Sequence, residues 1–285
     1  MVGARVGGGL KLEKKSGDTR RLYTDLAWLW PMWGDPAGEY AQYCQYVAGL
    51  IRQYATRPAV TLLDIGCGGG KNVANLSREF TVTGLDLSPA MLGQAQALNP
   101  GCTFVEGDMR TCRLGRAFDA VLVDDAISHM NCRADLAAAF RTAHDHLNPG
   151  GVMVVTPDVT TETFRQNRTT TTAATMGSVD VVFIENVYDA DPTDEQYETT
   201  ILYLIRDRGR LRIETEHWTM GIFAMSTWKQ ILQDVGFQVH EGACHVGDDE
   251  YRVFACVKRA DVERGARRGA TLDERRATDA RRRRH

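Results

Sequence analysis

The most specific indication of a ligand-binding site in the sequence is a glycine-rich turn, with the acid that follows it at a fixed spacing. Residues 62–72 read LLDIGCGGGKN, an apolar strand that runs directly into the turn and then into a helix. Glycines such as Gly66 and Gly68 let the backbone approach a ligand closely and present its N–H groups. Asp86 follows Gly66 by 20 residues, at the end of the next apolar run, where a carboxylate can accept both ribose hydroxyls of a nucleoside. The spacing therefore predicts a site for an adenosine-containing cofactor.

The residues around this turn exclude two other nucleotide-binding motifs. A phosphate-binding P-loop needs a glycine five positions before Gly70 and a serine or threonine after Lys71, whereas the sequence has Ile65 and Asn72 there. A dinucleotide-binding turn would have glycine or alanine at position 71, where the helix approaches the sheet. Asp64, directly before the turn, would repel a pyrophosphate but can support an ammonium group. S-adenosylmethionine, a cationic nucleoside with an amino-acid portion, satisfies these conditions.

A third acid strengthens this interpretation. Asp108 closes the next strand, where it can meet the amino group of adenine. Together with Asp64 and Asp86 it places carboxylates at three successive strand ends, which suits a cationic nucleoside. A simpler role for Asp64, compatible with the first, is to accept hydrogen bonds from the N–H groups of the turn.

With these motifs in order, the chain resembles the class I S-adenosylmethionine-dependent methyltransferases. The matching features are the D-x-G-x-G turn at 64–68, the strand-end Asp86, the G-D-M segment at 107–109 and the P-G-G strand start at 149–151. The resemblance covers residues 20–258. Within the class the chain is similar to the small-molecule branch of aminosugar N-methyltransferases and glycine N-methyltransferase. Softer signals for that branch are a tyrosine-rich leading segment and an insertion late in the chain.

The resemblance implies a set of cofactor-binding residues. Asp64, Gly66 and Gly68 would line the methionine portion, with Cys67 between the two glycines. The ribose would meet Asp86 and Leu87, and the adenine Asp108 and Met109. Tyr40 matches a family tyrosine that contacts the cofactor, and Asp124 is a further cofactor-side candidate. No metal site is predicted.

The acceptor side is less defined by sequence. His129 follows the fourth strand, and loops at the carboxyl ends of parallel strands surround the ligand crevice. With an unperturbed pKa near 6.5, a histidine is largely neutral at pH 7, so we predict that His129 orients the acceptor or accepts its proton. Tyr23 matches a family tyrosine across a gap and is the second catalytic candidate. Asp124 and Asp125 stand where aminosugar enzymes carry small polar or apolar residues, and they can begin a helix, face the cofactor or bind a basic acceptor.

Strands alternating with helices must position these residues. Apolar runs that predict parallel strands lie at 59–65, 80–87, 102–105, 118–123 and 152–155, and two more at 237–241 and 251–257 complete the sheet. Helix-compatible segments separate the first five runs, which implies right-handed crossovers and a sheet buried on both faces. We predict an α/β fold: a Rossmann-like, doubly wound, mostly parallel seven-stranded sheet.

Several helix boundaries follow from local signals. Residues 38–55 place apolar side chains at helical spacing, and Ser88-Pro89 is typical of a helix start. An apolar stripe from Leu136 to Leu147 predicts another helix, stopped by residues 148–151, after which a strand would begin at Val152. A helix over 227–235 should end at Gly236.

Residues 160–225 break the alternation and predict an antiparallel β insertion acting as a cap over the active site. A polar stretch at 167–172 leads into strand-like segments near 180–188, 197–205 and 211–224, separated by turn sequences. Earlier in the chain, Trp28, Trp30 and Trp33 can form a substrate wall or pack an N-terminal segment.

The ends of the chain differ from its body. We predict a flexible segment over residues 1–20, a methyltransferase domain over 21–259 and a disordered, arginine-rich tail over 260–285 with nine arginines against five acids. Net charge is −3. No signal peptide or membrane-spanning run is predicted. The seven cysteines are odd in number and form no C-x-x-C pair, which favours a reducing, cytoplasmic location.

The predicted activity is methyl transfer from S-adenosylmethionine, with S-adenosylhomocysteine as product, to a small-molecule acceptor by in-line displacement. An amine nitrogen of a metabolite or natural product is the favoured acceptor, since it needs only positioning and removal of a proton. The alternatives are O- or C-methylation of a small metabolite, methylation of RNA, nicotinamide-dependent reduction and a non-catalytic regulator that binds the cofactor. Nucleic acid is not expected as a partner, because no platform of aromatic and basic side chains is evident. A homodimer is compatible with the sequence.

Overall fold

A seven-stranded sheet forms the centre of the computed structural model, which describes residues 20–246 and 249–259. The predictions for the first 19 residues and for the arginine-rich tail lie outside the described residues. The strands of the sheet, in spatial order, are β10 (Phe237–Val246), β11 (Asp249–Lys258), β5 (Leu147–Val155), β4 (Phe118–Val123), β1 (Thr61–Ile65), β2 (Thr81–Asp86) and β3 (Thr103–Glu106). β11 is antiparallel to both of its neighbours, and the pairs from β5 to β3 are parallel. The predicted Rossmann-like sheet is confirmed.

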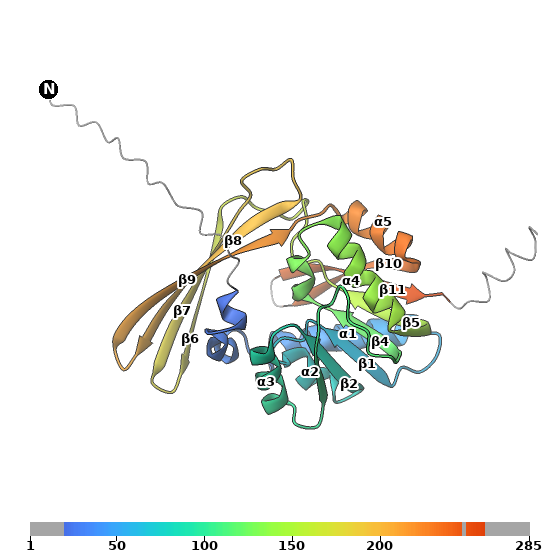
Figure 1. Cartoon of the computed structure of the whole chain (residues 1–285), viewed down its shortest axis with the longest axis horizontal. Helices are drawn as coiled ribbons and strands as arrows, with labels where there is room; N and C mark the ends of the chain where they lie inside the picture. The colour runs from blue at the N-terminus through green and yellow to red at the C-terminus, as the bar shows by residue number, and fades with distance from the viewer. Residues whose placement is uncertain (1–19, 247–248, 260–285) are drawn as a thin grey trace, which may run out of the picture.

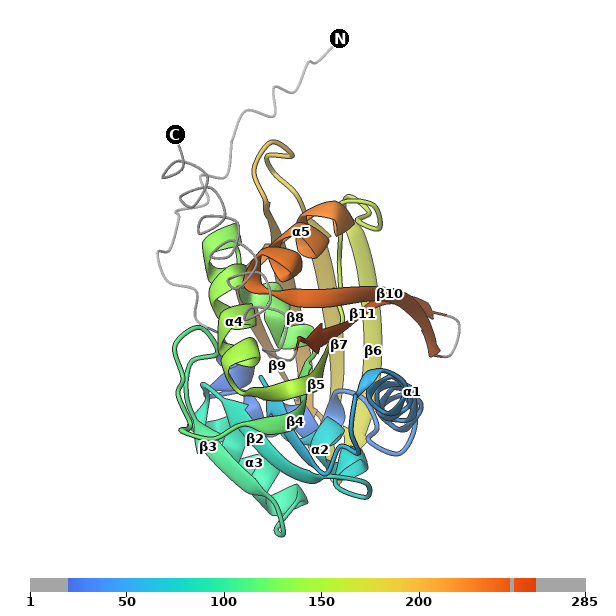
Figure 2. The same cartoon turned by 90° about the vertical axis from the view of Figure 1, so that its right-hand side faces the viewer.

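Helices cover both faces of this sheet (Figures 1 and 2). α1 (Glu39–Tyr54), α2 (Lys71–Leu76) and α3 (Pro89–Leu98) lie on one face, and α4 (Arg133–Asp145) and α5 (Met225–Val235) on the other. Alternate residues of β1 enter opposite cores, Leu62 beside α1 and Leu63 beside α4. Burial on both sides explains why the strands read as unbroken apolar runs.

Local signals placed most helix ends correctly. Ser88 is the N-cap of α3, and its Oγ accepts the N–H of Met91 at 3.1 Å. Gly236 ends α5 with a left-handed φ of 116°. The prediction around residue 147 was wrong: α4 ends at Asp145, and Leu147 already belongs to β5, where it pairs with Phe118. The strand thus begins before the glycines, which form an irregularity inside it.

Four antiparallel strands make a second sheet, in the order β6 (Arg168–Met176), β7 (Val179–Tyr188), β8 (Gln196–Asp207) and β9 (Arg210–Gly221). The insertion is therefore confirmed, with one strand more than predicted. The polar stretch read as a lead-in is most of β6, whose threonines are β-branched and suit an exposed edge strand. An apolar run was the wrong criterion for a strand that buries neither face.

Residues 21–32 lie between the two sheets (Figure 1). The 3₁₀ helices η1 (Arg21–Tyr23) and η2 (Ala27–Met32), with the residues that join them, contribute four buried apolar side chains to a third core shared with the second sheet. These side chains are Leu22, Leu26, Leu29 and Met32. We call residues 20–34 the cover segment, because several of them line the cavity described below.

Candidate active site

A cavity of about 590 Å³ opens at the carboxyl ends of β1, β2 and β4, below the cover segment. Eleven of the twelve predicted site residues line it: Tyr23, Tyr40, Gly66, Cys67, Gly68, Asp86, Leu87, Asp108, Met109, Asp124 and His129. The twelfth, Asp64, lies buried in β1 just before the glycine turn. Spacing in the sequence therefore located the cavity correctly.

The glycine turn takes a shape that other residues would strain. Gly66, Gly68 and Gly70 have φ of 79°, 50° and 78°, in the left-handed region that favours glycine. A Cβ at Gly66 would lie 2.4 Å from the Cβ of Ala126. The turn thus packs directly against the loop after β4, leaving its own backbone as one wall of the cavity.

Asp64 is the most unusual group of the site. The residue is 1% exposed, and neither carboxylate oxygen has a hydrogen-bond partner in the described chain. Burial, with smaller contributions from the charges of Asp124 and Asp86, raises its pKa well above the ordinary value. The expected hydrogen bonds from the turn to Asp64 are absent among the described residues. Because an unpaired buried carboxylate is costly, its geometry suits a cationic ligand group.

The turn instead binds Asp86. Its carboxylate accepts the N–H of Gly68 and the N–H of Ser88, each at 2.8 Å. These bonds fix the side chain at the cavity wall, although burial still raises its pKa. Leu87 beside it is 60% exposed at the same wall, so an apolar surface and an oriented carboxylate face the cavity together.

Asp108 has a partner that sequence reasoning missed. Arg110, two residues later, contacts its carboxylate through Nε and Nη2 and also bonds Asp135 at 2.8 Å. The hydrogen bonds to Arg110 lower the pKa of Asp108 below its ordinary value. Asp108 is therefore ionised and held in place, and Arg110 joins it in lining the cavity.

His129 and Tyr23 contact each other at the cavity wall. The Nε2 of His129 lies 3.2 Å from the Tyr23 hydroxyl, and the Tyr23 ring stacks on Trp218 of β9 at 5.5 Å. Burial lowers the pKa of His129 to about 3. The ring is therefore neutral at physiological pH and a weak base, which favours the orienting role that we considered over proton removal.

A group of carboxylates surrounds the loop after β4. Asp124 accepts a hydrogen bond from Asn72 Nδ2 at 2.9 Å and caps no helix through its side chain. Asp125 has φ of 29°, and its side chain is accessible only as part of the cavity wall, where it is set back from bulk solvent. The charge of Asp124 first, then burial, Asp158 and Glu185 raise the pKa of Asp125 well above its ordinary value. Several carboxyl groups are thus gathered around the end of β4, and each raises the pKa of a neighbour.

The cover segment supplies the residues that sequence reasoning did not place. Trp30 lines the cavity and lies against the glycine turn, because a Cβ at Gly69 would meet its ring at 2.3 Å. Trp33 instead packs on Phe183 of the second sheet, and Trp28 is 38% exposed. Of the three tryptophans, one therefore forms the expected wall. No residue of the antiparallel insertion lines this cavity among the described residues, where residues 20–34 form its cover. The insertion packs on this segment and contacts His129 through Trp218, so its role as a cap stays a prediction.

Comparison with known proteins agrees with this geometry. Residues 62–151 match the family described as methyltransferase domain. A dTDP-3-amino-3,4,6-trideoxy-alpha-D-glucopyranose N,N-dimethyltransferase of Streptomyces venezuelae is 40% identical over 44% of this chain, a match that spans 54% of that enzyme. A dTDP-3-amino-3,6-dideoxy-alpha-D-glucopyranose N,N-dimethyltransferase of Streptomyces fradiae is 30% identical over 70% of this chain and 78% of its own length.

The chain belongs to the aminosugar N-methyltransferase branch of the class I S-adenosylmethionine-dependent methyltransferases. A solved member of similar fold is an amino pentose methyltransferase of Micromonospora echinaspora involved in calicheamicin biosynthesis, with S-adenosylmethionine bound. It aligns with a TM-score of 0.68 and 25% identity over 77% of this chain and 91% of that one. The resemblance inferred from the motifs is confirmed, and with it the cofactor.

The residues of this methyltransferase fit S-adenosylmethionine on structural grounds as well. The partnerless oxygens of Asp64 offer a counter-charge for an ammonium group. Gly66 and Gly68 of the turn line the cavity, and Asp86 presents an oriented carboxylate to it. In the described part of the chain, no helix is both long and apolar enough to cross a membrane.

Proposed function

We propose that this methyltransferase transfers a methyl group to the amine nitrogen of an aminosugar. The observation that carries the proposal is the group of carboxyls around the end of β4, with Asp125 facing the cavity and the charges of Asp158 and Glu185 close enough to raise its pKa. Such a wall attracts a protonated amine and repels an anionic group placed at the same point. The names of the two dimethyltransferase relatives also support an amine on a sugar.

The residues divide between the two ligands. We assign Asp64, Gly66, Cys67 and Gly68 to the methionine portion of the cofactor, Asp86 and Leu87 to the ribose, and Asp108 and Met109 to the adenine. Tyr40 and Asp124 stand beside the same cavity and complete this set. Bound S-adenosylmethionine supplies an electrophilic methyl group to the acceptor.

Asp125 has the best properties for removing the proton of the amine. An alkylammonium is protonated at neutral pH and has no lone pair for attack. The raised pKa of Asp125 makes its carboxylate a stronger base than an ordinary aspartate. In the proposed step the carboxylate takes one proton from the ammonium, which leaves a neutral amine and a neutral carboxylic acid. His129 and Tyr23, whose Nε2 and hydroxyl lie 3.2 Å apart, orient that amine.

The second sheet has an acceptor-side role in this proposal. Glu185 of β7 adds charge near Asp125, and Trp218 of β9 supports both Tyr23 and His129. The insertion would then form part of the acceptor pocket, beside the cofactor cavity. We further propose that the enzyme is cytoplasmic, in line with its seven free cysteines, and that a homodimer can form through the exposed edge strand β6.

An acceptor panel tests the proposal. Nucleotide-linked aminosugars, the matching sugars with hydroxyl in place of amine, and a structured RNA are incubated with enzyme and S-adenosylmethionine, and products are read by mass spectrometry. Methylation of the amines alone is expected, and the mass gives the number of methyl groups. Methylation of the hydroxyl sugars or of RNA with the amines unchanged would refute the amine assignment.

A further inference from the structure

Lys71 is a buried cation whose bonding the reaction does not explain. It is 4% exposed and is the first residue of α2, where the helix dipole disfavours positive charge. Among the described residues no carboxylate lies within ion-pair distance of its ammonium. Burial accordingly lowers its pKa from the ordinary value to about 8. A lysine kept in so unfavourable a place needs compensation from its contacts.

The hydrogen-bond acceptors of Lys71 all lie in the cover segment. The Nζ of Lys71 donates to the carbonyl oxygens of Trp30 at 3.1 Å, Gly34 at 3.1 Å and Trp33. An ammonium has three protons, so these bonds use its full donor capacity. The Trp30 ring lies 4.9 Å from Nζ, and the Tyr40 ring lies 5.4 Å from it. Lys71 therefore links the last turn of η2 to the glycine turn.

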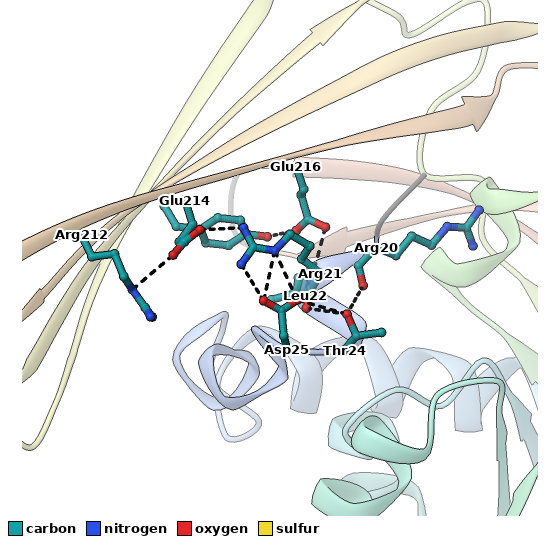
Figure 3. Close-up of polar contacts among 9 residues, drawn as sticks. Arg20, Arg21, Leu22, Thr24, Asp25, Arg212, Glu214 and Glu216 are labelled. Atoms are coloured by element: carbon teal, nitrogen blue, oxygen red, sulfur yellow. Dashed lines mark hydrogen bonds and ion pairs between the residues drawn. The ribbon is translucent and has the colours of Figure 1, made fainter. Parts of the chain in front are cut away.

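The other attachments of the cover segment lie farther from the glycine turn. On the side of the second sheet, Arg21 pairs with Glu214 at 2.6 Å, and the Leu22 N–H bonds Glu216, as Figure 3 shows. On the Rossmann side, Ser88 Oγ donates to the Tyr23 carbonyl at 2.5 Å. These contacts hold the start of the segment. Gln94 Nε2 also donates to the carbonyl of Ala27 at the start of η2. Among the described residues, Lys71 supplies the side-chain hydrogen bonds to the backbone of residues 30–34.

We propose that Lys71 is a positioning residue that holds the Trp30 part of the cover segment against the glycine turn and so completes the wall of the cofactor cavity. This inference rests on the proposed function only in taking that cavity as the site of the cofactor. Lys71 itself lines the cavity, but all three of its protons are bonded to backbone carbonyls. In this proposal it therefore acts on the cofactor through the cover segment rather than by a hydrogen bond of its own.

Two ligands and hydrogen exchange distinguish these modes of action. S-adenosylhomocysteine has an amino-acid carboxylate, whereas 5′-methylthioadenosine lacks it. In Lys71→Met we expect both ligands to bind at least about tenfold more weakly and backbone amides of residues 28–38 to exchange faster in the ligand-free protein. Lys258→Met is the matched control, because Lys258 also donates to two carbonyls, those of His144 and Leu147, far from this turn in the sheet order.

The pH dependence of the affinity for S-adenosylhomocysteine distinguishes positioning by the charged Lys71 from packing of its side chain alone. Wild-type affinity for S-adenosylhomocysteine should decline as pH rises through about 8, where Lys71 loses its proton. The charge of Asp35 favours the protonated lysine. Burial raises the pKa of Tyr40, which therefore stays neutral in this range. Lys71→Arg keeps its charge and should bind with no such decline. It also provides the test if the methionine variant does not fold.

Each outcome decides the proposal. Weaker binding of S-adenosylhomocysteine alone, with unchanged exchange and unchanged methylthioadenosine binding, would assign Lys71 to the cofactor carboxylate and overturn the positioning role. Unchanged exchange and unchanged affinity for both ligands, or the same pH decline in Lys71→Arg, would also overturn it. Failure of the wild-type protein to bind either ligand would instead refute the proposed function, and the exchange comparison would still test the contact.

Discussion

Replacing Asp64 by asparagine should weaken cofactor binding while stabilising the ligand-free protein. The carboxylate is fully buried without a partner, so in the bound state it can form a charge-assisted hydrogen bond with the ammonium group of the cofactor. Such bonds are worth about 1.5–3 kcal/mol. Since 1.4 kcal/mol corresponds to a tenfold change, S-adenosylhomocysteine should bind about 10- to 150-fold more weakly to Asp64→Asn.

Asp64→Asn should raise the stability of the ligand-free protein, although it lowers cofactor affinity. Burial raises the pKa of Asp64, so the folded protein binds this proton more tightly than the unfolded chain does. The ionised side chain therefore lowers stability once the pH exceeds the unfolded pKa of about 3.9, and the loss is complete above the folded pKa. Asp64→Asn lacks this charge. Its unfolding temperature should exceed that of the wild type at pH 7 and approach it at pH 4.

Calorimetric titration with S-adenosylhomocysteine and thermal unfolding of the ligand-free protein measure the two effects. Asp119→Asn is the control, because this carboxylate accepts the N–H groups of Thr61 at 3.0 Å and Val60 at 3.1 Å. It should lose stability and keep its affinity. Unchanged affinity in Asp64→Asn, or a lower unfolding temperature at pH 7, would refute the reasoning.

Three further predictions concern the acceptor wall and the glycine turn. Because His129 orients the acceptor and is a weak base in the fold, His129→Ala should lower turnover about 10²-fold at constant cofactor affinity. Its pKa of about 3 in the fold means that wild-type stability should fall as pH drops below about 6.5, and thermal unfolding should show a smaller loss in the variant. Asp125→Asn should lower kcat/KM for the amine most strongly below the pKa of the substrate, and equal loss at every pH would contradict its role as a base. Gly66→Ala should destabilise the fold by about 1–3 kcal/mol in denaturant unfolding, because its Cβ would meet Ala126 at 2.4 Å. Gly115→Ala, with φ of 68° and open space around it, has only the backbone strain and should cost less.

The parts of the site that sequence predicted are those fixed by short spacing. The turn at Gly66 and the acids Asp86 and Asp108 each follow a strand within a few residues, so the parallel order of the strands brings them to one edge. The contact between Asp108 and Arg110 was not predicted, but the sequence offered a signal for it, since the acid and the base are two positions apart. Local chemistry and strand order thus sufficed for the cofactor side.

The cover segment could not be predicted in the same way. Its position depends on contacts such as Arg21 with Glu214, which are 193 residues apart, and on Lys71 binding backbone carbonyls that have no side-chain signature. Three tryptophans within six residues indicated packing, but not that Trp30 alone would meet the glycine turn. Glu185 likewise reaches the acceptor side only because the second sheet folds back beside the loop after β4.

The most direct test of the central claim is the site of label transfer from S-adenosylmethionine that carries a deuterated methyl group. Wild-type enzyme is incubated with this cofactor and a nucleotide-linked aminosugar, and tandem mass spectrometry locates the label. We predict that the label lies on the amine nitrogen, with one S-adenosylhomocysteine formed for each methyl group transferred. A label on oxygen or carbon, or no label on any aminosugar although the cofactor binds, would contradict the account.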